Sequence, residues 1–167
     1  MSSQESRDRG TTAGYTLVVG AAGTTTTVTT TNASTYAIQG KMYKQSAAWT
    51  NKVHPTTDSN TSAAFPNIPA NYGSVLVYGT DSGGANLLVV QGKIVPLNDA
   101  GAFVTMPDFP SVPDTMCPLW YLTIKCGSTA TLGWTAAAAT IGNQASVTGV
   151  TYARQDVSVL PPRPQIS

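Results

Sequence analysis

Hydrophobic positions along the chain fall into short runs of strand length, which are separated by glycine, proline and asparagine. Such runs predict strands at residues 15–19, 74–78, 118–125, 131–135, 146–153 and 156–160. The run at 118–125 alternates in character, which predicts that Leu119 and Tyr121 lie on one side of a strand and Trp120 on the other. No segment shows sustained helical periodicity, so strands are the main elements that we expect.

Glycine-containing turns join several of these runs. A Gly-Gly pair within residues 81–84 divides the strand at 74–78 from a returning strand at 87–95, because glycine readily adopts the positive φ of tight hairpin turns. Similar turns are expected at residues 39–41 and 98–101, the second leading into a short strand at 103–105. A chain organised in this way is built from antiparallel hairpins.

The strands and turns together predict an all-β protein: a single antiparallel β-sandwich, jelly-roll-like or barrel domain. The chain has 167 residues, enough for one domain with its own core. We expect a flexible N-terminal arm at residues 1–14, the β domain at 15–160 and an extended Pro-rich C-terminal tail at 161–167. Inside the domain, the threonine-rich run 24–31 is expected to be a strand that needs a partner strand or subunit.

The longest stretch without a strand pattern is residues 49–72, which contains three prolines and many Asn, Ser and Thr residues. Loops of this length are uncommon in compact domains unless they carry function, so this loop is a candidate contact surface. Trp49 heads the loop and is expected to be exposed, whereas Trp120 and Trp134 lie in strand-like runs and are expected in the core.

Charge is scarce, and this narrows the possible partners. Charged residues make up 10% of the chain, the net charge is +1, and the basic residues are scattered rather than gathered into a patch for nucleic acid. No run reaches the ~18 apolar residues of a membrane span, and the first fourteen residues lack the apolar region of a secretory signal. We therefore expect neither a nucleic-acid nor a membrane partner, and a protein assembled in a cytoplasm.

Few residues are available for catalysis. His54 is the only histidine, and we interpret it as a surface loop residue, since Asp58 lies four positions away in a Pro-containing loop where that spacing implies no contact. Asp108 and Asp114 flank a Pro-rich stretch and are the least implausible pair of acids for catalysis. An enzyme that uses these groups is the least supported hypothesis for the function, and we expect a protein that is not an enzyme.

The two cysteines, Cys117 and Cys126, lie nine residues apart in a predicted strand. A straight strand of that length would hold them about 30 Å apart, so we expect two free, buried thiols rather than a disulfide. Two thiols are too few for a structural zinc site, and no phosphate-binding or calcium-binding motif is present. No cofactor and no metal are expected.

Several segments between residues 35 and 162 resemble small virion structural proteins of tailed bacteriophages, of the capsid decoration (cement) type. The similar segments are Tyr-Ala-Ile-Gln-Gly-Lys at 36–41, Pro-Thr-Thr-Asp at 55–58 with Ala-Ala-Phe at 63–65, Val-Val-Gln-Gly at 89–92, Phe-Pro-Ser-Val-Pro-Asp at 109–114 and Asp-Val-Ser-Val-Leu-Pro at 156–161. The resemblance implies a β-rich oligomer on a capsid shell. No segment in it is diagnostic of a chemistry.

The function expected from the sequence is therefore that of a non-enzymatic virion protein, located on the capsid surface, that stabilises a bacteriophage capsid by bridging major capsid protein subunits. Its expected partners are the major capsid protein and further copies of itself, in a homotrimer. The candidate assembly contacts are Tyr15, Leu17, Val19, Trp49, Pro161, Pro162, Arg163 and Ile166. The alternative is a head-fibre or adhesin-like module that contacts host glycan through the 49–72 loop.

Overall fold

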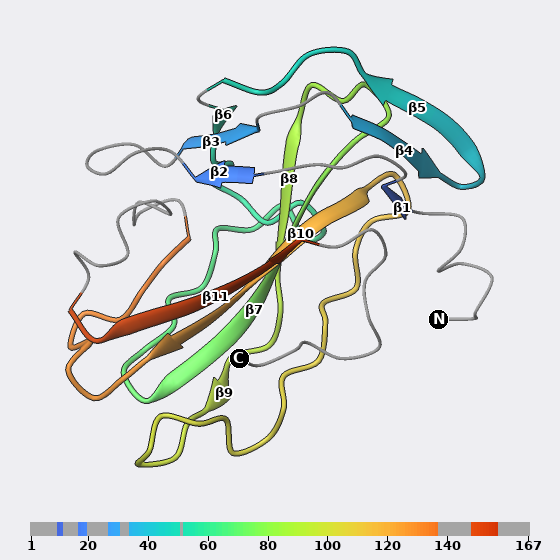
Figure 1. Cartoon of the computed structure of the whole chain (residues 1–167). Coiled ribbons are helices and arrows are strands. Elements are labelled where there is room, and N and C mark those ends of the chain that lie inside the picture. The colour runs from blue at the N-terminus through green and yellow to red at the C-terminus, as the bar shows by residue number, and fades with distance from the viewer. Residues whose placement is uncertain are drawn as a thin grey trace.

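The computed structural model describes residues 10–11, 17–19, 27–30, 34–50, 52–136 and 148–156, and all regular structure in these residues is antiparallel β (Figure 1). The prediction of an all-β, sandwich-like protein is confirmed. Its strands form three sheets, and side chains from residues as far apart as 36 and 150 share one hydrophobic core.

The large sheet contains the longest strands. They are β7 (Tyr72–Thr80), β8 (Leu87–Gln91), β10 (Cys117–Cys126) and β11 (Val150–Asp156), in the order β11-β10-β7-β8, and the short β9 (Val95–Pro96) also pairs with β7. Figure 1 views this sheet from its β11 side, with β11 in front of β10 and β7. The predicted hairpin turn at 81–84 is confirmed, since it joins β7 to β8.

Two smaller sheets lie toward the upper end of the molecule in Figure 1. The first, which we call the hairpin sheet, contains β1 (Gly10–Thr11), β4 (Ser34–Ile38) and β5 (Lys41–Gln45), and its β4–β5 turn lies where the sequence predicts a hairpin. The second contains β2 (Leu17–Val19), β3 (Thr27–Thr30) and β6 (Lys52–Val53). The threonine-rich segment thus has two partner strands, as a run that buries little requires.

Both faces of the large sheet are buried. One face packs against the hairpin sheet, the loop that follows Trp49 and residues 130–136, and this layer makes the architecture sandwich-like. The other face carries Val75, Val77 and Tyr121, which pack against Val112 and Met116 of the Pro-rich segment. Two-sided burial explains why nearly every residue of β7 and β10 is buried, rather than every second one.

A β-bulge corrects the predicted alternation in β10. The register between β10 and β7 shifts between Pro118 and Trp120, so that Leu119 belongs to the same hydrophobic cluster as Trp120. The sequence predicts Leu119 on the side of Tyr121, which lies in the other cluster, and that prediction is wrong. An extra residue in one strand moves a side chain to the opposite face, and proline at the start of the strand has no N–H to hold the register.

Three predicted strands are shorter than expected. Residues 131–135 make only an isolated bridge from Trp134 to Ile68, and residues 103–105 only one from Phe103 to Leu97. The strand at 87–95 divides into β8 and β9 around Gly92, whose N–H donates to Val75 O. Of the predicted strands near the termini, residues 15–16, 146–147 and 157–160 lie outside the described residues.

Candidate assembly surfaces

His54 follows β6 and is buried in the core, with 2% of its surface exposed, so its interpretation as a surface residue is wrong. Its Nδ1 lies 2.7 Å from Pro55 O, and because a carbonyl only accepts, Nδ1 carries the proton. Its Nε2, 3.2 Å from the Tyr78 hydroxyl, therefore accepts a hydrogen bond from Tyr78. The ring also packs edge-on against Phe65 and Tyr78. Both nitrogens are used within the fold.

Burial also determines the charge of this pair. Removal from water lowers the pKa of His54 from 6.5 to about 4, although the hydrogen bond to Pro55 acts in the opposite direction. Burial raises the pKa of Tyr78 well above its usual value of 10.0. At neutral pH the imidazole and the phenol are both uncharged, and the arrangement stabilises the core rather than presenting a base to a substrate.

Trp49 is buried as well, with 4% of its surface exposed, and the prediction that it is an exposed contact is wrong. Its Nε1 donates to Gly84 O at 2.8 Å, and the Tyr36 hydroxyl donates to Asp81 O at the same distance. The two aromatic side chains thus hold the β7–β8 turn. Gly84 has a φ of +66°, and a Cβ there would lie 2.9 Å from the Tyr36 hydroxyl, so glycine is required. The glycan-binding alternative loses the residue on which it was based.

Asp58 binds the long loop to the outer edge of β8. Its Oδ1 accepts from the backbone N–H groups of Asn60 and Thr61, and its Oδ2 accepts from Gln91 N–H at 2.7 Å. Next to it, Ser59 N–H donates to Val89 O, and Val89 N–H donates to the Ser59 hydroxyl. Polar groups of the loop thus occupy the positions that another strand would take, and the β8 edge is closed.

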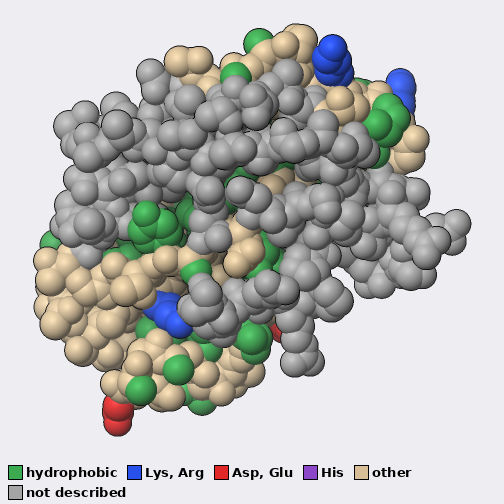
Figure 2. Space-filling view, viewed as in Figure 1, with side chains coloured by type: hydrophobic (Ala, Val, Ile, Leu, Met, Phe, Trp, Pro, Cys, Tyr) green, Lys and Arg blue, Asp and Glu red, His purple; other side chains and the backbone are tan. Residues whose placement is uncertain are grey.

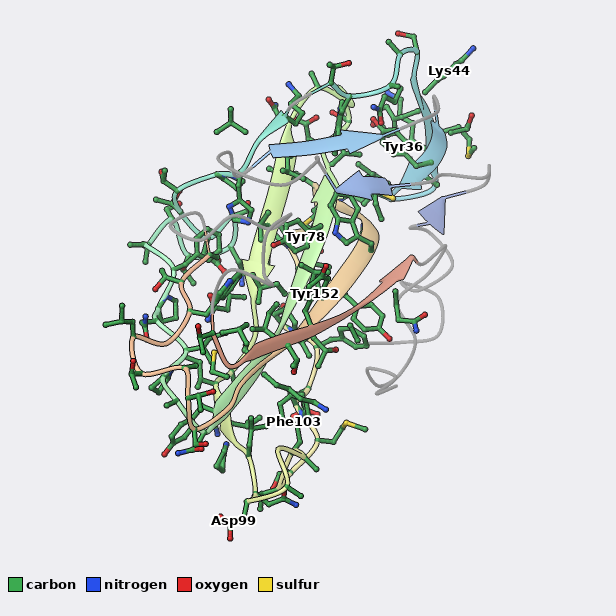
Figure 3. All side chains as sticks on the ribbon, turned by 60° about the vertical axis from the view of Figure 1, so that its left-hand side comes forward. Tyr36, Lys44, Tyr78, Asp99, Phe103 and Tyr152 are labelled. Atoms are coloured by element: carbon green, nitrogen blue, oxygen red, sulfur yellow. The ribbon has the colours of Figure 1, made fainter. Side chains whose placement is uncertain are left out.

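One end of the molecule exposes apolar side chains on a stiff support. This end, here called the knob, consists of residues 97–106, which project beyond β9 (Figure 1). Asn98 Oδ1 accepts from the N–H groups of Ala100 and Ala102, and these hydrogen bonds fix the turn. Figure 3 shows Asp99 at the tip and Phe103 closer to the large sheet.

Phe103 fastens the knob to the large sheet. A Cβ on Gly73 would lie 2.6 Å from Phe103 Cε1, so the ring packs directly against the backbone of Gly73. Lys125 Nζ lies 5.3 Å from the ring centroid, within the range of a cation–π interaction. Beyond this anchor, Val104 is 62% exposed and Met106 is 39% exposed, and Val104 N–H donates to Pro96 O. Hydrophobic side chains are visible among polar ones at this end in Figure 2.

The exposed apolar side chains of the knob were not expected from the sequence, because residues 98–105 were interpreted as a plain hairpin. The signal was present: Val104 and Met106 are an apolar pair that follows a polar turn, at the end of a predicted strand only three residues long. Tyr72, which is paired with Pro96 across the sheet, is also 40% exposed.

The remaining predicted site residues have mixed outcomes. Leu17 and Val19 lie in β2, opposite Thr30 and Val28, whereas Tyr15, Pro161, Pro162, Arg163 and Ile166 lie outside the described residues. Asp108 and Asp114 are both exposed. Cys117 and Cys126 are free and buried at opposite ends of β10, as predicted, and burial raises the pKa of the Cys126 thiol to about 11. Trp120 and Trp134 are buried, as predicted.

Two kinds of feature are absent from the described residues. None of their His, Cys, Asp and Glu side chains gather in a group of three or more that could hold a metal ion. The same part of the chain contains no helix long and apolar enough to cross a membrane. Comparisons of the chain with protein-family models, with curated proteins and with solved structures found no match.

Proposed function

We propose that this protein is a non-enzymatic structural protein of a bacteriophage virion, which decorates the capsid and stabilises it by bridging major capsid protein subunits. The observation that carries the proposal is the knob. Val104 and Met106 are exposed there, next to a turn that is held by the hydrogen bonds of Asn98 and by the contact of Phe103 with the large sheet. A preformed apolar projection binds a partner without first losing conformational entropy, which favours affinity.

The use of the titratable side chains supports a structural role. His54 donates to Pro55 and accepts from Tyr78 inside the core, so it is neutral and shielded. Asp58 accepts hydrogen bonds from the loop and from β8. A general acid or base must reach a substrate proton, and these two side chains are directed at the protein's own backbone and core instead.

The placement on a virion rests on the resemblance of the segments between residues 35 and 162 to capsid decoration proteins. Physical reasoning agrees with that placement. A cement protein contacts its lattice many times, so a small apolar contact gains strength through the repetition of the sites. The partners in this proposal are the major capsid protein and further copies of the chain, on a capsid surface assembled in the host cytoplasm.

The test is sedimentation of the purified protein with capsids that were assembled without it. We expect the wild-type chain to pellet with the capsids and to raise the temperature at which they open. A double variant, Val104→Asp with Met106→Asp, is expected to bind at least tenfold more weakly, because it puts two charges into an apolar contact.

Leu132→Asp is the matched control, since Leu132 is 91% exposed on a different loop. It should bind like the wild type. All three proteins should give the same circular dichroism spectrum, because the changed side chains lie at the surface. Failure of the wild type to pellet would exclude the capsid as partner, and undiminished binding of the double variant would exclude the knob.

A further inference from the structure

Residues 54–65, here called the edge loop, begin and end in one aromatic cluster. His54, which starts the loop, lies edge-on to Phe65, which ends it, with ring centroids 5.4 Å apart, and edge-on to Tyr78 of β7 at 5.5 Å. Tyr78 in turn stacks on Trp120 of β10, at 5.0 Å. All four side chains are at most 5% exposed. One buried imidazole therefore joins both ends of the loop to the centre of the large sheet.

Between these ends, the edge loop carries the polar groups that close the β8 edge. Gln91 N–H donates to Asp58 Oδ2, Val89 N–H donates to the Ser59 hydroxyl, and Ser59 N–H donates to Val89 O. Within the loop, Asp58 N–H donates to Ala63 O at 2.8 Å, so the loop has hydrogen bonds of its own. The loop can therefore leave the edge as a folded unit, without unpairing a strand of the large sheet.

This cluster does not accommodate a proton on His54. Nε2 would become a donor, and the Tyr78 hydroxyl, which donates to it in the neutral form, would lose its acceptor. The pKa of His54 is lowered by burial and raised only by the carbonyl of Pro55, so no charged side chain of the described residues stabilises the cation. Asp58 directs its carboxylate at backbone N–H groups, and Lys52 of β6 is itself a cation. A buried charge without a partner is strongly destabilising.

The strands beneath the cluster bring no counter-charge either. β7, β8 and β10 contain no acidic residue, and Lys125 of β10 lies over the Phe103 ring. A protonated imidazole must therefore reach water. Tyr78 is paired with Val89 on one side and with Trp120 on the other, so the sheet holds it in place. Water reaches His54 at the lowest cost when the edge loop moves.

We infer that the edge loop is an acid-sensitive cover of the β8 edge: protonation of His54 releases residues 54–65 from β8, while β7, β8 and β10 stay paired. The released loop leaves the N–H groups of Val89 and Gln91 without their acceptors, and an open edge of this kind recruits another strand. The inference concerns the fold alone and does not rest on the proposed capsid function.

The experiment is amide hydrogen exchange of the full chain at pH 7 and at pH 5, with each rate compared with that of an unfolded peptide at the same pH. The pKa of His54 is about 4 in the closed loop and 6.5 in water, so the opening equilibrium rises about tenfold per pH unit between these values. We expect the protection of the Val89 and Gln91 amides to fall about 20-fold. The Leu122 amide, in the central strand β10, should stay far more protected at both pH values.

His54→Gln is the matched variant, because glutamine keeps a polar side chain at this position but takes up no proton in this range. The protection of Val89 and Gln91 in this variant should be the same at pH 7 and at pH 5. Asp99→Ala, at the tip of the knob, retains His54 and should show the fall seen in the wild type.

Three results would overturn the inference. The first is unchanged protection of Val89 and Gln91 in the wild type between pH 7 and pH 5. The second is an equal fall in His54→Gln. The third is equal protection of Val89 and Leu122 at pH 5, since the chain would then open only as a whole; this comparison is made in the wild type and stands without any variant. None of these results bears on capsid binding through the knob.

Discussion

The two outer edges of the large sheet are treated in opposite ways. At β8, the loop that contains Asp58 and Ser59 supplies a carboxylate, a hydroxyl and a backbone N–H to the groups that would otherwise recruit a strand. At β11, the described strands supply no partner beyond β10. The difference teaches that this chain blocks one edge of a sheet with a few polar groups from a loop.

The cover of the β8 edge is held in place by buried side chains on both flanks. Trp49 donates to Gly84 at one end of the loop, and His54 bonds to Tyr78 beneath it. Phe65 packs in the same core at the other end. Because these anchors are buried, the loop is a structural part of the sheet, and changes that weaken the anchoring should expose the β8 edge.

The largest expected effect follows from Asp58→Ala. The change removes the acceptor for the N–H groups of Asn60, Thr61 and Gln91. Losing charge-assisted hydrogen bonds while leaving partly buried donors unpaired should lower the free energy of unfolding by about 3 to 5 kcal/mol. Denaturant unfolding measures it, with Asp99→Ala at the exposed knob tip as control. A loss below that of the control would mean that the loop does not depend on Asp58.

A smaller loss of stability is expected when the pH is lowered. The folded state keeps His54 neutral, with a pKa of about 4 against 6.5 in an exposed chain. The contribution of His54 to the free energy of unfolding is therefore complete above pH 6.5, and it is lost as the pH falls toward 4, because the unfolded chain takes up a proton first. A shift of this size corresponds to about 3 kcal/mol at the acid end. Unfolding measured from pH 7 to pH 4 should show a steeper decline for the wild type than for His54→Gln. Parallel curves would exclude His54 as the cause.

The smallest effect is expected from Ser59→Ala. Val89 N–H loses its acceptor, which should cost about 1 kcal/mol of stability. Hydrogen exchange sharpens the test: the Val89 amide should exchange faster, whereas the Gln91 amide, which Asp58 holds, should keep its rate. Ser111→Ala at an exposed position should leave both amides unchanged. If Val89 keeps its slow exchange, the β8 edge is protected by something other than this hydroxyl.

The sequence predicted the local elements well where turn chemistry decides them. Glycine at positions 40 and 84 has positive φ, and both hairpins lie where the sequence indicates. The sequence predicted the faces of side chains and the lengths of strands less well, because these depend on burial on two sides and on changes of register. Leu119 changes face because of a bulge, and residues 131–135 and 103–105 stay irregular because their neighbours in space offer only single bridges.

The candidate surfaces were harder to predict than the strands. Trp49 and His54 sit in a stretch of polar residues and prolines, which favours exposure, yet both are core residues because the loop folds back over the large sheet. Conversely, Val104 and Met106 have ordinary apolar character but are exposed, because the Pro-rich segment after them turns to cover the other face of the sheet. Exposure is a property of what packs on a residue, and that is not a local pattern.

The sequence by itself determined the β class, the two hairpin turns, the buried free cysteines and the scarcity of groups for catalysis, because these follow from residue type and short-range spacing. Only the tertiary structure decided which edge of the sheet is closed. That closure depends on Asp58 and Ser59 meeting Val89 and Gln91, residues about thirty positions away. Contacts over such separations depend on how the whole chain packs, and a single sequence carries no local signal for them.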